Sequence, residues 1–349
     1  MTKLAFNYHC TKIEHLQTAT TRLVAALVLI TVINLYIFIN YPTQKRPLSN
    51  INRPLWSQDI NFETANIKND TGTPDGCYLV PNHIHFIRFG NPRFTYPEMI
   101  CVLAALKNQK PDKITFHHNF NGSFTGPYWR VLSKLKAFTD IVEFNYEEEP
   151  KEIFGQPIDP ALRKFHGSDI TRIRILMKYG GIFLDNDCYV IKNLNSFRKY
   201  EMTLNWDQDQ YLGTQVLLAH KDARFLKMWL DSYRGAYRGD LWYYNAGERP
   251  TTEILWRRPE LIHRVKVQFG VDTHWIEQVF QESWTGWRRL HALHLLIHHQ
   301  YLLANLTAKA TFPVQFNQHN IAYYPITFRE MAYDVYETGN IPWPKEYKD

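Results

Sequence analysis

Two carboxylates, Asp185 and Asp187, lie between two short apolar runs, and they give the strongest chemical signal in the sequence. Residues 182–184, which follow a Gly-Gly pair, predict a short buried strand that ends at the first carboxylate. In a continuing strand, residues two apart point to the same face, so each carboxylate would raise the pKa of the other. A divalent cation removes that penalty and keeps positions for substrate phosphates. We therefore predict a metal and phosphate site at a strand's carboxyl end, where open α/β sheets bind ligands.

A D-x-D triplet alone is a weak signal, because about one is expected by chance in a chain of this length and acidic content. The sequence contains a second triplet, Asp207-Gln208-Asp209, with no apolar strand on its far side. We interpret that second triplet as a loop. The difference between the two triplets lies in the residues that precede them.

The segment before the first triplet has the pattern of a helix. Apolar residues recur at helical spacing through residues 162–179, and the Gly-Gly pair then stops the helix. Asp169 and Arg172 are three residues apart and share one side of this helix. A weak surface ion pair is the simplest interpretation. If this end of the helix lies near Asp185, however, the carboxylate could bind sugar or ribose hydroxyls and the guanidinium could bind phosphate.

Strand-like and helix-like segments alternate along the first half of the chain. Strand patterns occur at 78–87, 113–117, 139–144 and 182–184, with helical patterns at 95–109, 126–135 and 162–179 between them. This order predicts an α/β fold with a mainly parallel sheet flanked by helices, and places Asp185 at the end of about the fourth strand. Further along we expect strands at 201–204, 214–218 and 265–269, helices at 223–233 and 253–258, a long aromatic loop at 235–250 and an irregular, histidine-containing end.

Composition narrows the class of protein. The chain has 349 residues, of which 45% are hydrophobic, as in a globular protein with a sizeable core. Its formal charge is +6, but residues 1–50 hold five basic residues against one acidic residue, so the remainder carries only +2 and shows no nucleic-acid footprint. None of the four cysteines forms a C-x-x-C pair. If the later part is lumenal, one disulfide and one free thiol are expected among Cys77, Cys101 and Cys188.

An apolar, uncharged run at residues 23–39 predicts a membrane segment. We assign residues 1–22 to a cytoplasmic tail, 23–41 to a transmembrane signal anchor, 42–76 to a stem and 77–349 to a lumenal catalytic domain. A cleaved signal peptide and a buried core helix are the alternatives. Glycosylation sequons at Asn69, Asn121 and Asn305 favour a lumenal location for the larger part.

Taken together, the helix, the Gly-Gly pair and the acidic triplet resemble the signature of a known family, the DXD-containing sugar-binding glycosyltransferases. The family includes yeast initiating α-mannosyltransferases, Golgi α-1,4-galactosyl- and α-1,4-N-acetylglucosaminyltransferases, and the catalytic domain of clostridial glucosylating toxins. The pattern S-D-x-x-R-x-x-x-L-x-x-x-G-G-I-F-L-D-x-D is carried here by Ser168, Asp169, Arg172, Leu176, Gly180, Gly181, Asp185 and Asp187.

Two other segments are similar to family motifs more weakly. Residues 81–87 resemble the family's first strand, P-x-x-I-H-x-x-W, with His85 at the histidine and Arg88 where the tryptophan usually stands. Ala292-Leu293-His294 resembles a late A-x-H-x-W motif, again without its tryptophan.

The resemblance implies a GT-A-like fold and a retaining transfer of a hexose or N-acetylhexosamine. The implied donor is a nucleotide sugar, here UDP-sugar, with Mn²⁺ or Mg²⁺ as cofactor, and the acceptor is a hydroxyl of a glycan, glycolipid or glycoprotein. It also implies a single-pass type II protein of the Golgi membrane. The implied metal ligands are Asp185, Asp187 and His294, and the other donor contacts are His85, Asp169, Arg172 and Asn186.

Chemistry agrees with this set, because a cation between Asp185 and Asp187 would stabilise a leaving diphosphate. No carboxylate stands out as a nucleophile, so front-face attack is the mechanism that needs the fewest residues. Two alternatives stay open. One is an inactive module that binds sugar nucleotides or glycans. The other is a haloacid-dehalogenase-like phosphatase, whose D-x-D-x-T/V motif would require Thr or Val where this chain has Tyr189.

Overall fold

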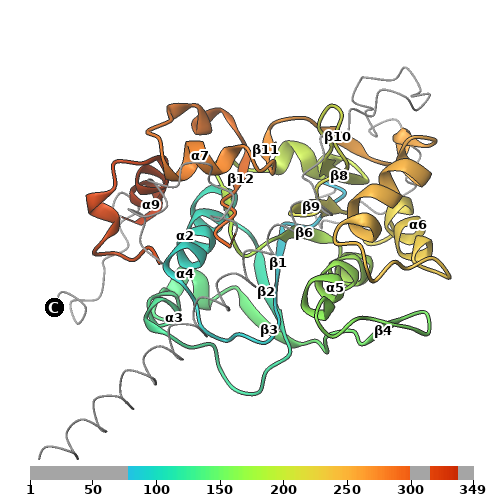
Figure 1. Ribbon diagram of the computed structural model, residues 1–349. Coiled ribbons are helices and arrows are strands. Elements are labelled where there is room, and N and C mark those ends of the chain that lie inside the picture. Colours follow the sequence, from blue (N-terminus) through green and yellow to red (C-terminus); the bar gives the residue numbers. More distant parts are fainter. Residues whose placement is uncertain (1–77, 299–314, 337–349) are drawn as a thin grey trace, which may run out of the picture. The chain divides into compact units, whose positions relative to one another are not determined.

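The computed structural model describes residues 78–298 and 315–336, which contain a seven-stranded mixed sheet (Figure 1). Four neighbouring strands are parallel, whereas β9 runs antiparallel to both β6 and β8. The predicted α/β sheet, mainly parallel and flanked by helices, is thus confirmed. In spatial order the strands are β10 (His263–Val265), β8 (Met202–Asn205), β9 (Val216–Ala219), β6 (Gly181–Leu184), β1 (His83–Arg88), β2 (Lys113–His118) and β3 (Val142–Tyr146).

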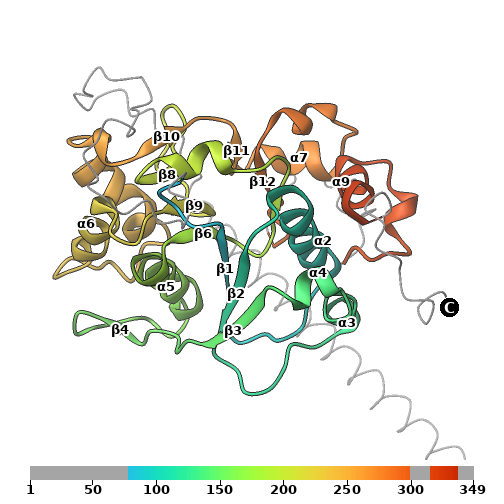
Figure 2. The same ribbon diagram turned by 180° about the vertical axis from the view of Figure 1, so that it is seen from behind.

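Helices cover both faces of this sheet. Figures 1 and 2 agree that α2, α3 and α4 lie on one face and that α5 and α6 lie on the other. The helix bounds are α2 (Tyr96–Ala104), which continues as a π-helical turn, η2 (Ala105–Gln109), then α3 (Pro127–Leu132), α4 (Lys136–Thr139), α5 (Arg163–Tyr179), α6 (Arg224–Ser232), α7 (Trp275–Phe280) and α9 (Thr327–Tyr336). Shorter elements are β4 (Glu152–Ile153), β5 (Gln156–Pro157), η3 (Asn195–Lys199), η4 (Tyr244–Glu248), η5 (Pro250–Leu255), η6 (Pro259–Leu261), η7 (Thr285–Arg289) and η9 (Ile321–Tyr323).

Strand β6 contributes to a hydrophobic core on each face. Ile182 and Leu184 pack into the core under α2, whereas Phe183 packs into the core under α5 and α6. This alternation follows from the two-residue period of a strand. All four residues of β6 are buried, so the strand that leads to Asp185 is fixed from both sides.

The order in which the chain adds strands to the sheet reverses between β1 and β6. It first builds β1, β2 and β3 outward in order, then returns through α5 and adds β6 on the other side of β1. Such a reversal leaves a crevice at the carboxyl ends of the two central strands, where open α/β sheets bind ligands. Asp185 directly follows β6 and therefore lies at this crevice.

The predicted helix before β6 is confirmed, and two glycines end it. The N–H of Gly180 donates to the carbonyl of Leu176 at 2.8 Å, with a φ of 63°. Gly181 follows at a φ of 110°, and a Cβ built there would lie 2.4 Å from the carbonyl oxygen of His83. Only glycine lets the chain turn this tightly against β1 and enter β6.

A second, three-stranded sheet lies beyond the acidic triplet. Strand β7 (Cys188–Val190) pairs antiparallel with β12 (Ala292–His294), which pairs with β11 (Phe269–Gly270). The register places His294 opposite Cys188, one residue beyond Asp187. Our expectation that this end is irregular was wrong for β12, which at three residues is too short to give a readable alternation.

The strand expected at residues 265–269 is also wrong as a single element. Val267 has a φ of 61° and its N–H donates to the Asp207 carboxylate, so the segment divides into β10 and β11. The second acidic triplet is a loop, as predicted, and one of its carboxylates is used in this turn.

Several other expectations concern the membrane and the secretory pathway. Cys101 and Cys188 are buried free thiols, and Cys77 lies outside the described residues. The expectation of a disulfide among these three cysteines was therefore wrong. Within 78–298 and 315–336, no helix has both the length and the apolar character needed to cross a bilayer. The predicted tail, anchor and stem, and the sequons at Asn69 and Asn305, lie outside these ranges. Asn121 is exposed in the loop after β2.

Replacement of Gly181 by alanine is expected to destabilise the protein by at least about 3 kcal/mol, because the new Cβ meets main-chain atoms at an unfavourable φ. Gly155→Ala is the matched control: its φ is also positive, at 78°, but no atom lies within 4 Å, so a loss of only about 1–2 kcal/mol is expected. Urea unfolding of both variants measures the difference. Equal losses would show that the contact with His83 is unimportant.

Candidate active site

The acidic triplet forms the turn between β6 and β7, and its two carboxylates point to different partners. The Asp185 N–H donates to the Gln215 carbonyl at 2.9 Å, and the Asp185 carbonyl accepts from the Cys188 N–H at 2.9 Å. The chain therefore turns here, and the expectation of a continuing strand with both carboxylates on one face was wrong. The side chain of Asp185 meets Arg172 from α5, and that of Asp187 meets His294 from β12.

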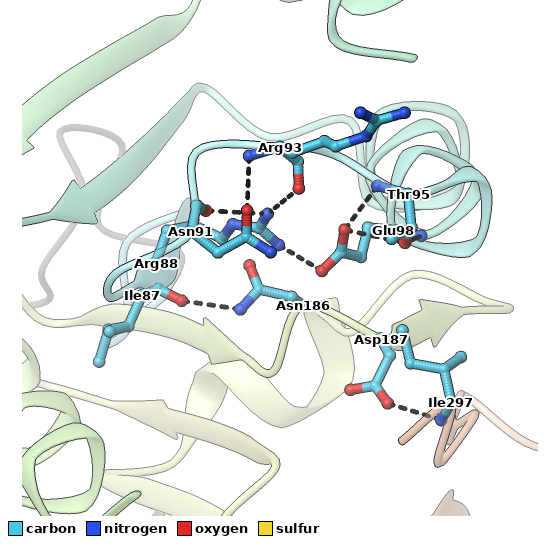
Figure 3. A network of polar contacts seen from close by, with 9 residues as sticks. All are labelled: Ile87, Arg88, Asn91, Arg93, Thr95, Glu98, Asn186, Asp187 and Ile297. Carbon is cyan, nitrogen blue, oxygen red and sulfur yellow. Dashed lines mark hydrogen bonds and ion pairs between the residues drawn. The ribbon is translucent and has the colours of Figure 1, made fainter. Parts of the chain in front are cut away.

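The middle residue, Asn186, links the two central strands of the large sheet. Its amide nitrogen donates to the carbonyl of Ile87 at 2.7 Å, near the end of β1. Figure 3 shows the Asn186 side chain turned toward Ile87, while Asp187 is directed toward Ile297. The side chain of Asn186 thus connects the triplet to the end of β1.

Arg172 of α5 contacts two carboxylates, that of Asp169 on the same helix and that of Asp185 directly after β6. Its guanidinium lies 3.1 Å from Asp169 Oδ1 and 3.4 Å from Asp185 Oδ1. It also donates to the carbonyls of Thr214 at 2.8 Å and Ser168 at 3.3 Å, and its Cζ lies 4.7 Å from the centre of the Phe183 ring. The predicted pair on α5 therefore includes Asp185 as well. Since these bonds occupy the guanidinium, its role in this structure is to position the two carboxylates.

Burial dominates the electrostatics of this cluster. It raises the pKa of Asp169 to about 6, because the attraction of Arg172 only partly offsets the loss of water and Asp185 adds repulsion. Burial likewise raises the pKa of Asp185, against the opposing effect of Arg172. One arginine thus serves two carboxylates, and the cluster favours additional positive charge or a hydrogen-bond donor.

Asp187 and His294 form the second half of the site. Their Oδ1 and Nε2 atoms are 3.1 Å apart, and Asp187 Oδ2 accepts from the Ile297 N–H at 3.1 Å. Burial opposes the charge on Asp187, but the contacts with His294 and Ile297 outweigh it and lower the pKa of Asp187 to about 2. Burial also opposes the charge on His294, and Asp187 outweighs it to raise the pKa of His294.

These residues suit a divalent cation by their chemistry. Carboxylate oxygens and an imidazole nitrogen match the ligand preferences of Mn²⁺. Nδ1 of His294 is a buried nitrogen without a hydrogen-bond partner among the described residues, and Asp185 keeps 27% of its side-chain surface exposed. Within 78–298 and 315–336, no three His, Cys, Asp or Glu side chains are already gathered into a metal site. Asp185 would have to exchange its contact with Arg172 for the ion.

Three tyrosines beside Asp169 are site residues that the sequence did not single out. Tyr233 follows α6 and is buried with no hydrogen-bond partner for its hydroxyl in the described structure. Burial and the Asp169 carboxylate raise the pKa of Tyr233, and the same two causes, in that order, raise that of Tyr243. Tyr237 bonds to His166 of α5 at 2.6 Å. Two of them come from the aromatic segment 235–250, whose composition was the only available signal.

His85, the third of the six residues of β1, packs against the C-terminal end of α5. It is fully buried, with its ring nitrogens 3.0 Å from His117 and 2.9 Å from the Gly180 carbonyl. Its ring stacks 5.7 Å from Tyr179, the last residue of α5, which is about 10 Å along the helix from Arg172. These contacts place His85 in the packing between β1 and α5, and its role as a donor contact stays a prediction.

Arg88, at the position of the family's tryptophan, is occupied by contacts within the protein. Figure 3 shows its guanidinium between the Glu98 carboxylate, with which it forms a buried ion pair, and the carbonyls of Asn91 and Arg93. Glu98 also accepts from the N–H of Thr95 at 2.7 Å and so forms the capping box of α2. Arg88 therefore fixes the connection from β1 to α2.

Comparison with known proteins gives a family match for the part of the chain that contains α5 and the triplet. Residues 98–204 match the family model described as a glycosyltransferase sugar-binding region containing a DXD motif. Residues 98–204 are thus similar to the sugar-binding region of DXD-containing glycosyltransferases. The resemblance drawn from the sequence is thereby confirmed, and the matched residues include α5 and the acidic triplet.

Two curated relatives are similar over part of their length. Glucan organizing enzyme 1 of Cryptococcus neoformans is 27% identical over 192 residues, which is 49% of this chain and 49% of that protein. Lactosylceramide 4-alpha-galactosyltransferase of Mus musculus is 27% identical over 124 residues, which is 35% of this chain and 33% of the mouse protein. The aligned part of the chain thus spans half or less of the length of each of these relatives.

Solved glycosyltransferases superpose only partially. The bifunctional WbbM gives a TM-score of 0.45 at 10% identity over 77% of this chain and 51% of that chain. The galactosyltransferase LgtC, solved with donor and acceptor sugar analogues, gives 0.40 at 13% identity over 76% of this chain and 98% of its own. The DXD assignment depends on the family match and the curated relatives.

The raised pKa of Asp169 predicts a specific dependence of stability on pH. Because its native pKa of about 6 exceeds the ordinary value of 3.8, the native state holds this proton more tightly, and the residue's contribution to stability falls as pH rises between these values. Asp169→Asn should therefore gain roughly 2–3 kcal/mol relative to wild type between pH 4 and pH 7.

Metal-free protein unfolded by urea at both pH values gives this difference. The matched control is Asp240→Asn, which removes an exposed carboxylate whose pKa is lowered by a hydrogen bond from Arg238. It should show a small trend of the opposite sign. A stability difference between wild type and Asp169→Asn that is the same at both pH values would contradict the assignment.

Proposed function

We propose that the protein is a metal-dependent retaining glycosyltransferase that moves a hexose or N-acetylhexosamine from a UDP-sugar to a hydroxyl of a glycan, glycolipid or glycoprotein. The observation behind the proposal is that two clusters of polar side chains lie at the carboxyl end of β6, where the strand order of the sheet reverses. Asp169, Arg172 and Asp185 form one cluster, and Asp187 with His294 forms the other. The DXD family match supports the same conclusion.

Each cluster is proposed to hold one part of the donor. Asp185, Asp187 and His294 would hold Mn²⁺ or Mg²⁺, which when bound offsets the negative charge that develops on the leaving diphosphate. Asp169 is the hydrogen-bond acceptor for hydroxyls of the donor sugar, and Arg172 keeps it oriented. Asn186 holds the triplet against the end of β1, so that the two clusters keep their spacing.

The positions of the carboxylates favour front-face attack with retention. Asp169 and Asp185 both contact Arg172, and Asp187 contacts His294 and the Ile297 N–H. None of these three is free to attack the anomeric carbon while it keeps those contacts. The acceptor hydroxyl would then approach on the side of the leaving group, and its proton would pass to the phosphate oxygen.

The phosphatase alternative finds no support at the second residue after the triplet. Tyr189, at the Thr/Val position of that motif, is buried, and its hydroxyl donates to the Met331 carbonyl at 3.0 Å on α9. Its hydroxyl is thus used in the packing of α9. The inactive binding module differs from an enzyme by its turnover, which the following experiment measures.

With Mn²⁺ present, the wild-type protein is expected to hydrolyse at least one of UDP-galactose, UDP-glucose and UDP-N-acetylglucosamine slowly, and chelation should abolish this. Asp187→Asn should lower the rate about 100-fold or more, because it weakens charge stabilisation of the leaving group. It should also lose the rise in melting temperature that Mn²⁺ and UDP give the wild type.

Asp209→Asn is the matched control, since it changes the second D-x-D triplet at a residue with a φ of 59°, which asparagine tolerates. It should retain both properties. Donor binding without turnover in the wild type would favour the inactive module, and equal activity of both variants would contradict the proposed metal site.

We further propose that the catalytic domain lies in the Golgi lumen, behind the anchor at residues 23–41. The exposed Asn121 then becomes accessible to glycosylation. Expression in a secretory host should give a mass that falls on enzymatic removal of N-glycans, with one glycan fewer in Asn121→Gln. Identical masses for wild type and Asn121→Gln would count against a lumenal location.

A further inference from the structure

Phe165 and Trp242 form an exposed aromatic pair beside the site. Their side chains are 47% and 45% exposed, yet the ring centres are only 4.4 Å apart in an edge-to-face arrangement. The pair joins the first turn of α5 to the aromatic segment 235–250. Large aromatic rings that are exposed to solvent and pack against each other form an apolar surface of fixed shape.

This pair continues the row of site residues along α5. Phe165, Asp169 and Arg172 are separated by four and three residues, so they lie on one face of the helix. The pair is therefore about 6 Å from Asp169 along the helix axis, on the side toward solvent. Burial follows the same order: Phe165 is exposed, Asp169 is partly buried and Arg172 is buried.

Trp242 is held in place by the loop that carries it. The side chain of Asn245 accepts from the Arg238 N–H at 2.9 Å and donates to the Arg238 carbonyl at 2.6 Å, which closes the loop at its base. The next residue, Tyr243, turns inward and donates to the Leu212 carbonyl at 2.6 Å. Trp242 is thus presented outward from an anchored position.

Polar groups accompany the pair. His166 directly follows Phe165, bonds through Nδ1 to the Tyr237 hydroxyl at 2.6 Å and interacts with the main chain of Trp242. The Tyr233 hydroxyl beside Asp169 is buried and has no hydrogen-bond partner among the described residues. Such a group favours a ligand that can exchange hydrogen bonds with it.

We propose that Phe165 and Trp242 form the platform that binds the acceptor sugar. A pyranose has a face of C–H groups and a rim of hydroxyls, so it can stack on an aromatic ring while its hydroxyls reach polar groups beside the ring. This arrangement sets the acceptor next to Asp169, where the donor sugar is expected. The inference rests on the proposed transfer activity and adds the location of the second substrate.

The test compares Trp242→Ala and Phe165→Ala with wild type in the purified full chain. Transfer from the active UDP-sugar is measured to methyl β-lactoside, methyl β-glucoside and methyl α-mannoside, alongside donor hydrolysis without acceptor. We expect each variant to raise the acceptor KM roughly tenfold, as the loss of one aromatic contact implies. The donor KM and the hydrolysis rate should be unchanged, because neither ring contacts the metal or diphosphate residues.

Tyr323→Ala is the matched control, since this tyrosine is 82% exposed and belongs to η9, outside α5 and its neighbours. It should leave every parameter unchanged, and melting temperatures should show that all variants fold. An unchanged acceptor KM in both ring variants overturns the platform, even if Trp242→Ala weakens binding to phosphatidylcholine vesicles. Donor hydrolysis without transfer to any of the three glycosides also counts against it. Absence of donor hydrolysis in the wild type overturns the proposed function instead.

Discussion

The contact of one buried arginine with two carboxylates is the constraint on which the site depends. Arg172 brings Asp169 of α5 to Asp185 at the end of β6, and burial raises the pKa of both carboxylates. Removal of one partner from such a cluster leaves an uncompensated buried charge. Two buried carboxylates share one arginine, which agrees with the proposal that this cluster receives a cation and a polar ligand.

The fold produces this contact through the length of α5 and the turn that ends it. Seventeen residues of helix run back along the sheet, and Gly180 and Gly181 then reverse the chain into β6 with no intervening loop. Since helix and strand are joined so tightly, the N-terminal half of α5 lies beside the carboxyl end of the strand that it precedes. The same geometry places the C-terminal end of α5 beside His85, which explains why this residue of the first-strand motif packs against Tyr179.

The sequence was sufficient for the features that have local causes. Hydrophobic period, glycine stops and strand–helix alternation predicted α5, β6 and the parallel strands, because each depends on neighbouring residues. Features that depend on distant pairing were not predicted. Strand β12 is three residues long and reaches Asp187 only through its register with β7, and the strand break at Val267 depends on Asp207, about sixty residues earlier. Arg172 and His294, the separate partners of Asp185 and Asp187, likewise come from other segments of the chain.

Arg88 shows how a change in one motif residue can be compatible with an intact site. The guanidinium is neutralised by Glu98 and its donors are used by the carbonyls of Asn91 and Arg93. The Asn186 side chain donates to the carbonyl of the neighbouring Ile87, so the hydrogen bond between the triplet and β1 does not involve the side chain of residue 88. In the proposed function, an aromatic surface for a sugar or a base comes from another element. The segment around Trp242 supplies one on the α5 side of the crevice, beside Asp169.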